Sequence, residues 1–140
     1  MDDTPSASER ARAANELGAA LCISVHMNGG EPMAEGCTCF FYGTGETFSP
    51  AGQRLAELVQ DAVTEGLGLK DGRTHPLAVA LLRETRMPAI QVEPCFITNP
   101  SEEAIVTDPP SRRALAAAIA SGIEAFFEAR EHRAAAAGPA

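Results

Sequence analysis

Residues 21–30 read LCISVHMNGG, and this short apolar run followed by a turn decides how the rest of the chain is organised. Side chains alternate between faces in a strand, so Cys22, Ser24 and His26 are expected to share one face. Asn28 and the two glycines after it form a strong turn signal. The stretch therefore predicts a strand that presents His26 at its end, beside a turn with room for a ligand.

Helical and strand patterns alternate on both sides of this strand. The spacing predicts a helix before it, with Ser6 or Ser8 available as the cap and Gly18 near its end. Further strands are expected at CTCFFYG (37–43), LAVALLRET (77–85) and AIQVEPCFI (89–97), and further helices from Ser49-Pro50 to residues 66–68, over 102–106 and from Ser111 onward. This order predicts an α/β fold, with a mostly parallel or mixed sheet sandwiched by helices.

Length and composition fit one domain. A chain of 140 residues can bury one core and hardly two. We expect that domain to cover residues 1–130, and residues 131–140 to form a disordered tail without apolar periodicity. The formal net charge is −8 and the basic residues are scattered, which argues against a nucleic-acid partner. No apolar run approaches the roughly 20 residues of a membrane span.

The four cysteines do not form a metal-binding or disulfide pattern. Their positions lie inside apolar runs, without any C-x-x-C pair. Buried, reduced thiols are the expectation for Cys22, Cys37, Cys39 and Cys95.

Two polar residues stand where chemistry is expected in such a sheet, His26 and Glu93. Ligands of open α/β sheets gather beyond the carboxyl ends of strands. Glu93 interrupts the apolar run AIQVEPCFI, where an unpaired carboxylate is costly, so it needs a partner or a task. Glu93 is either a general base or the ion-pair partner of Arg83 or Arg86. His26 is either a zinc ligand or only a hydrogen-bonding partner of Asn28 or of the backbone.

Several ordered motifs decide between these alternatives. The segments are RARAANELGAALCISVHMN, GCTCFFYG, LLRETRMPAIQVEPCFITNPSEEAIV and AAAIASGIEAFF. In this order they resemble the zinc-dependent N-acetylmuramoyl-L-alanine amidases, which are peptidoglycan hydrolases. The family's S-x-H-x-N strand end is matched by Ser24, His26 and Asn28. Its later motifs are matched by Leu82, Arg83, Thr85, Pro88 and Ala89, and by Val92, Glu93, Phe96 and Asn99.

The resemblance implies that Zn²⁺ is the cofactor, that His26 is a metal ligand and that Glu93 is the catalytic residue. Ser24, Asn28, Arg83 and Asn99 are then candidates for substrate contact or for support of the site. The implied substrate is peptidoglycan or a muropeptide, cut at the amide between N-acetylmuramic acid and L-alanine. The family's other two zinc ligands, a His and a Glu, precede its matching helix and have no counterpart here. The chain is therefore expected to be the C-terminal two-thirds of such a domain, with the first strands missing.

Two further residues bear on the site. His75 is a candidate replacement ligand or an exposed loop residue, and the second alternative is favoured. Cys95 stands where the family has Gly, and its thiol is expected to crowd the site or to offer a substitute ligand, with crowding favoured.

Three hypotheses follow for the protein. It is an amidase whose missing ligands are encoded upstream, a non-catalytic relative that binds peptidoglycan, a precursor or a regulatory partner, or a fragment with an open sheet edge. An extracytoplasmic or cell-wall location is expected if an N-terminal signal precedes the chain, and a cytoplasmic one for the chain as written.

Overall fold

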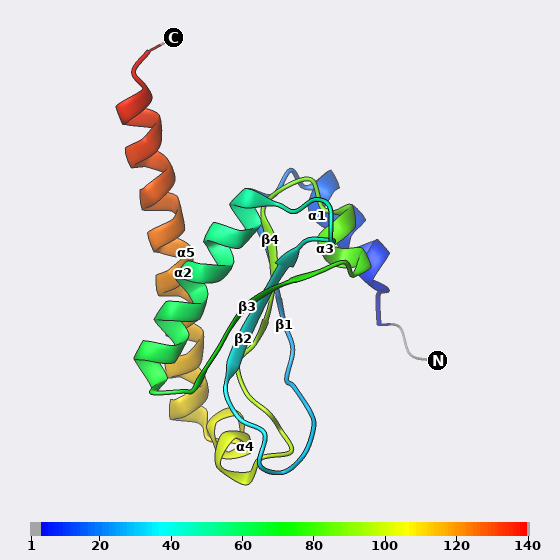
Figure 1. Cartoon of the computed structure of the whole chain (residues 1–140), viewed down its shortest axis with the longest axis vertical. Coiled ribbons are helices and arrows are strands. Elements are labelled where there is room, and N and C mark those ends of the chain that lie inside the picture. Colours follow the sequence, from blue (N-terminus) through cyan, green and yellow to red (C-terminus); the bar gives the residue numbers. More distant parts are fainter. Residues whose placement is uncertain (1–3, 140) are drawn as a thin grey trace.

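A mixed sheet forms the centre of the structure, a computed structural model that describes residues 4–139 (Figure 1). Its strands are β1 (Cys22–Val25), β2 (Cys37–Tyr42), β3 (Asp71–Leu77) and β4 (Ala89–Glu93), in the spatial order β1-β4-β2-β3. The pairs β1–β4 and β2–β3 are parallel, whereas β2 and β4 are antiparallel. The predicted α/β fold with a mixed sheet is confirmed.

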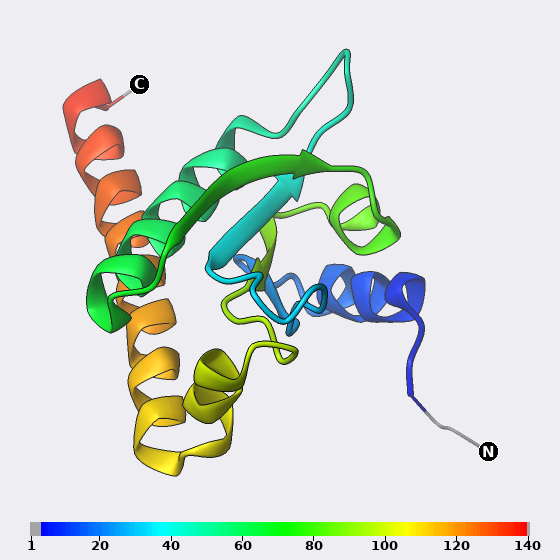
Figure 2. The same ribbon diagram turned by 60° about the horizontal axis from the view of Figure 1, so that its bottom comes forward.

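Helices lie on both sides of this sheet. They are α1 (Ala7–Glu16), α2 (Pro50–Leu67), α3 (Ala80–Glu84), α4 (Pro100–Thr107) and α5 (Pro109–Ala137). Figure 2 shows α2 and α5 packed together on one side, with α1 beside α3 on the other. The helix α4 lies at the end of the sheet where β4 leads into it (Figure 1).

The covered face of the sheet, facing α2 and α5, carries the main core. In β2 the side chains alternate strictly, with Cys37, Cys39 and Phe41 buried while the residues between them are half-buried. Ile90 and Val92 of β4 are fully buried in the same cluster as the apolar stripe of α2. This alternation leaves the even-numbered residues of β2 on the opposite face. We call it the open face, because α1 and α3 cover only part of it.

Local capping explains where the helices begin. Ser6 accepts a hydrogen bond from the Glu9 backbone N–H, and the Glu9 carboxylate accepts one from the Ser6 backbone in return. Ser49 caps α2 by accepting a hydrogen bond from the Gly52 backbone N–H at 3.0 Å, and Pro50 takes the first position of the helix. These starts agree with the sequence pattern.

One strand prediction is wrong. The run LAVALLRET does not form a strand: Leu77 ends β3, and α3 begins at Ala80. A short continuous apolar run has the same pattern in a buried strand and in a buried helix turn, so periodicity alone does not separate them. The actual strand β3 contains Pro76 and mostly exposed residues. It is an edge strand, where a proline is tolerated.

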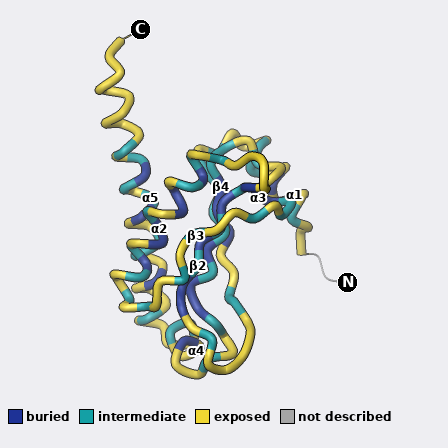
Figure 3. The backbone as a smooth tube through the Cα atoms, in the orientation of Figure 1, coloured by how far each residue is buried: buried dark blue, intermediate teal, exposed yellow. Residues whose placement is uncertain are grey.

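The last helix is longer than expected. It continues to Ala137 as an exposed extension, where we expected an irregular tail from residue 131, and Ala140 lies outside the described residues. Alanine has the highest helix propensity, so the run of four alanines can extend the helix without packing. Figure 3 shows that this end of α5 is almost entirely exposed. Leu17, the C-cap residue of α1, is also 82% exposed.

Within residues 4–139, all four cysteines are free thiols, as expected. Cys37, Cys39 and Cys95 are buried as expected, whereas Cys22 is half-buried. None of the helices described there is long and apolar enough to cross a membrane.

Candidate functional site

His26 and Glu93 lie at the same end of two neighbouring strands. Val25 of β1 is paired with Val92 of β4, and the His26 backbone N–H donates to the Val92 carbonyl at 2.9 Å. Continuing the register by one residue places His26 opposite Glu93. Adjacent residues in a sheet point to the same face, so both belong to the open face, opposite the α2–α5 layer.

The carboxylate of Glu93 is partly buried and has one hydrogen-bonding partner among the described side chains. Gln91 Nε2 donates to Glu93 Oε1 at 3.0 Å. The alternative in which Glu93 pairs with an arginine is not realised in the described part of the chain: the Arg83 guanidinium contacts Glu84 at 3.4 Å, and Arg86 forms no ion pair there. The Glu93 carboxylate therefore keeps an oxygen available for a ligand or a water molecule.

Two predicted support residues tie together the loops after β1 and β4. The Asn28 side chain accepts from the Gly29 backbone N–H at 2.8 Å, and its backbone pairs with that of Phe96. Asn99 caps α4 and donates through Nδ2 to the Ala34 carbonyl at 3.2 Å. Both asparagines form hydrogen bonds with the backbone of these loops. The loops that they fix lie around the ends of β1 and β4.

The other two support candidates lie further from the strand ends. Ser24 is 7% exposed and is paired with Gln91 across β1 and β4. Arg83 belongs to α3, where its guanidinium donates to the Ala78 carbonyl at 3.2 Å. It lies before β4 begins, whereas Glu93 lies where β4 ends.

Glu102 is a residue whose role the sequence pattern did not reveal. It lies in the first turn of α4, yet its side chain is only 6% exposed. One carboxylate oxygen accepts from the Gly36 backbone N–H and the other from the Phe96 backbone N–H, each at 2.7 Å. This carboxylate joins the start of β2 to the segment after β4, and so fixes the site end of the sheet. Its position six residues after the apolar Phe96 gave no signal of burial.

Cys95 does not crowd the open face. It is fully buried, and β4 ends at Glu93 because Pro94 follows, so the alternation of faces does not extend to Cys95. Burial raises the pKa of the Cys95 thiol to about 11, with Glu102 and Cys37 adding to the effect. A thiol with this pKa is protonated at neutral pH, so Cys95 is a packing residue.

The described residues do not complete a zinc site. No group of three or more His, Cys, Asp or Glu side chains in positions 4–139 is arranged to hold a metal ion. A catalytic zinc requires three protein ligands with an open position. His26 can supply one nitrogen ligand, and the exposed His75 lies in β3, three strands away from β1. The donor set of this part of the chain therefore does not fit zinc by itself.

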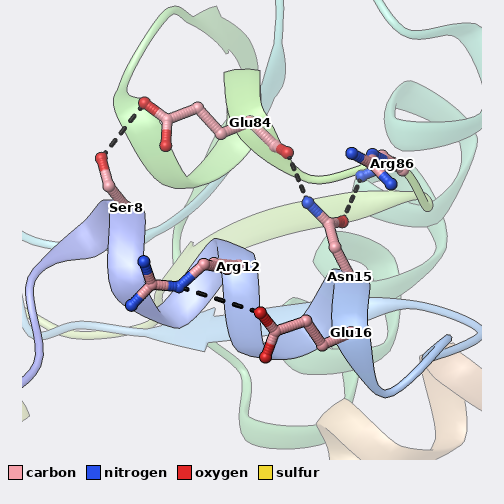
Figure 4. Close-up of a pocket in the computed structure, with 6 residues that line it drawn as sticks. All are labelled: Ser8, Arg12, Asn15, Glu16, Glu84 and Arg86. Atoms are coloured by element: carbon pink, nitrogen blue, oxygen red, sulfur yellow. Dashed lines mark hydrogen bonds and ion pairs between the residues drawn. The ribbon is translucent and has the colours of Figure 1, made fainter.

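A separate polar pocket of about 430 Å³ lies between α1 and the turn that leads into β4 (Figure 4). Asn15 uses both ends of its amide there, since Nδ2 donates to the Glu84 carbonyl and Oδ1 accepts from the Arg86 backbone N–H, each at 2.8 Å. Ser8 adds a hydrogen bond to the Glu84 carboxylate at 3.1 Å. These bonds fasten α1 to the beginning of β4, so this pocket lies at the opposite end of β4 from Glu93.

Comparison with known proteins gives a consistent result. The family model described as N-acetylmuramoyl-L-alanine amidase matches residues 1–125. The amidase CwlM of Mycobacterium tuberculosis is 35% identical over 126 residues, which are 89% of this chain and 31% of that protein. The amidase LytC of Bacillus subtilis is 28% identical over 120 residues, 85% of this chain and 24% of that protein. The chain thus spans less than a third of either relative.

Solved structures agree with this result. The N-acetylmuramoyl-L-alanine amidase of Clostridium difficile 630 superposes with a TM-score of 0.82 at 30% identity, covering 91% of this chain and 68% of that one. The catalytic domain of CwlV from Bacillus (Paenibacillus) polymyxa gives a TM-score of 0.80 at 26% identity, with 91% and 69% coverage.

Proposed function

Because the chain belongs to the N-acetylmuramoyl-L-alanine amidase family, we propose that it hydrolyses the amide between N-acetylmuramic acid and L-alanine in peptidoglycan. One observation carries this proposal. Two polar residues of the family motifs, His26 and Glu93, lie at the same end of the neighbouring parallel strands β1 and β4. Open α/β sheets bind their ligands beyond the carboxyl ends of their strands, which is where these two residues lie. The proposed place of action is the cell wall.

Glu93 is the proposed proton carrier. Amide hydrolysis needs a base that takes a proton from the attacking water and an acid that delivers a proton to the departing amine. One carboxylate serves both steps if it stays close to the reacting atoms. The hydrogen bond from Gln91 fixes one oxygen of Glu93 and leaves the second for that exchange.

Zn²⁺ is the proposed cofactor, and His26 is proposed as one of its ligands. When bound, zinc would polarise the amide carbonyl and acidify a water molecule. Since residues 4–139 bring together no set of three donors, a complete centre requires ligands beyond those they provide. The roles proposed for this chain are therefore those of Glu93, of His26 as one ligand, and of the loops that Asn28 and Asn99 hold.

A second candidate function is recognition without cleavage. The incomplete donor set favours it, because the loops and the open face are in place whether or not a metal is held. In this form the protein binds peptidoglycan, a precursor or a regulatory partner at the same carboxyl ends of β1 and β4.

Two measurements on the purified protein separate these functions. In a protein that carries the complete set of zinc ligands, metal analysis should find stoichiometric zinc, and a muramoyl-peptide should be cleaved at the lactyl amide. Glu93→Gln should keep the zinc and lower kcat by at least about a hundredfold, because a general base contributes 10²–10⁴. Glu103→Gln, an exposed glutamate of α4, is the matched control and should keep full activity.

Each outcome has a clear meaning. Full turnover by Glu93→Gln would remove Glu93 from the catalytic role. Binding of the muramoyl-peptide by a wild-type protein that holds no zinc and cleaves nothing would refute the amidase proposal in favour of recognition.

A further inference from the structure

A β-bulge in β3 changes which side chains reach the open face. Cys37 is paired with Asp71, but Cys39 is paired with Thr74, so β2 advances two residues while β3 advances three. The extra residue is accommodated at Arg73, which has the left-handed φ of 68°. Bulges of this kind re-aim side chains and are frequent beside functional sites.

The bulge is braced by polar contacts. The buried Gln60 donates through Nε2 to the Cys37 carbonyl at 2.6 Å and to Asp71 Oδ1 at 2.8 Å. The Arg73 backbone N–H donates to the same Asp71 oxygen at 2.8 Å. These donors, Gln60 first, hold the pKa of Asp71 below its ordinary value. The left-handed turn at Arg73 is thus fixed by its surroundings.

The consequence concerns the neighbour of Phe40. In an unbroken ladder starting from Cys37 and Asp71, Phe40 would stand beside Thr74. With the extra residue, Phe40 is paired with His75, and their ring centroids are 6.3 Å apart at an interplanar angle of 41°. The bulge therefore turns an imidazole onto the open face.

The imidazole is also held in one orientation. His75 Nε2 lies 2.9 Å from the Gly72 carbonyl, inside the bulge. A nitrogen that bonds a carbonyl must carry the proton, so the other nitrogen, Nδ1, is the acceptor of the neutral ring. His75 is exposed, and its Nδ1 is available to a donor from a ligand.

Phe40 and His75 lie in one row across the sheet with Gln91, the residue that donates a hydrogen bond to Glu93. Gln91 is paired with Phe40 and donates to Glu93, so Ser24, Gln91, Phe40 and His75 form one line across all four strands. His75 lies two strand spacings across and two residues along the sheet from Glu93, roughly 12 Å at about 4.8 Å per spacing and about 3.3 Å per residue. That distance leaves room for one sugar ring between His75 and an amide held at Glu93.

We propose that Phe40 and His75 form a sugar-binding subsite for the N-acetylmuramic acid ring of the substrate; this inference rests on the proposed function. The row is built from neutral side chains, an aromatic ring and an imidazole acceptor. Such a surface suits a ring with an apolar face and hydroxyl donors. A stem peptide carries carboxylates, which a chain of net charge −8 with Glu93 nearby would repel.

Binding without turnover tests this subsite. The probe is the disaccharide N-acetylglucosaminyl-N-acetylmuramic acid, with its lactyl carboxylate converted to the methyl amide, and it is added to full-length Glu93→Gln protein. The His75 ring signals in a ¹H–¹⁵N spectrum should shift saturably with this probe and remain unchanged with the free stem peptide. His75→Ala should weaken the calorimetric Kd about fivefold, whereas His132→Ala, an exposed histidine of α5, should leave the Kd unchanged.

The outcomes separate the two proposals. His75 signals that move only with the stem peptide, or a wild-type Kd in His75→Ala, would overturn the sugar subsite even if the protein is an active amidase. Saturable sugar binding that depends on His75 supports the subsite even if the protein cleaves no amide. Phe40→Leu provides a second variant, which removes the aromatic ring and keeps an apolar side chain, and it should weaken sugar binding in the same way.

Discussion

The two faces of the sheet have different roles, although the same strands form both. On the covered face, Ile90 and Val92 are fully buried and apolar. On the open face of the same strand, Gln91 and Glu93 are half-buried and bonded to each other. The covered face supplies the stability of the fold by removing apolar surface from water. The open face therefore keeps polar groups that a ligand can reach, because they are not needed for the core.

The largest expected change in stability distinguishes the two faces within the single strand β4. Ile90→Ala should lower the free energy of unfolding by about 3 kcal/mol, because it leaves a cavity in the core. Gln91→Ala, its neighbour on the open face, should cost less than about 1 kcal/mol. Urea unfolding followed by circular dichroism measures both values. Equal losses from the two variants would contradict the division of roles between the faces.

A somewhat smaller loss of stability is expected at Glu102, whose carboxylate joins the start of β2 to the segment after β4. Glu102→Ala should cost about 2 kcal/mol, since it leaves the backbone N–H groups of Gly36 and Phe96 without their acceptor. Glu103→Ala, the exposed neighbour, should stay within about 0.5 kcal/mol of wild type. Thermal unfolding of the two variants compares them directly. A mild effect at Glu102 would mean that water replaces the carboxylate and that the joint is not buried.

The smallest expected change in stability concerns the bulge of β3 that brings His75 to the open face. Arg73→Gly should stabilise the protein by about 0.5 kcal/mol, because glycine adopts the left-handed φ without a steric cost, although it also loses more entropy on folding. The His75 ring signals should stay unchanged, since the bulge is kept. A loss of stability would show that the Arg73 side chain, and not the backbone turn, holds the bulge.

Some features of the fold follow from local sequence. The capping residues Ser6 and Ser49 and the start of β4 at Ala89 were predicted at their observed positions, because caps and buried strands have short-range signals. The strand predicted over residues 89–97 ends earlier, at Glu93. The placement of β3 was missed for the opposite reason. Residues 71–77 are polar and contain a proline, so only pairing with β2 makes them a strand.

The candidate site divides in the same way. His26 and Glu93 were proposed from the sequence because His26 ends one apolar run and Glu93 interrupts another. The burial of Glu102 was not found, since it depends on segments that meet only in the folded chain. The expectation that Cys95 crowds the site failed because Pro94 ends the alternation of faces one residue earlier.

The sequence by itself determined the α/β class, the family motifs and the two residues at the strand ends, because all of these depend on residue type and short spacing. The tertiary structure decided which neighbours those residues have. Register is a non-local property, and one extra residue in β3 exchanges Thr74 for His75 beside Phe40. For this reason the open face that accompanies Glu93 could be recognised only after the strands were paired.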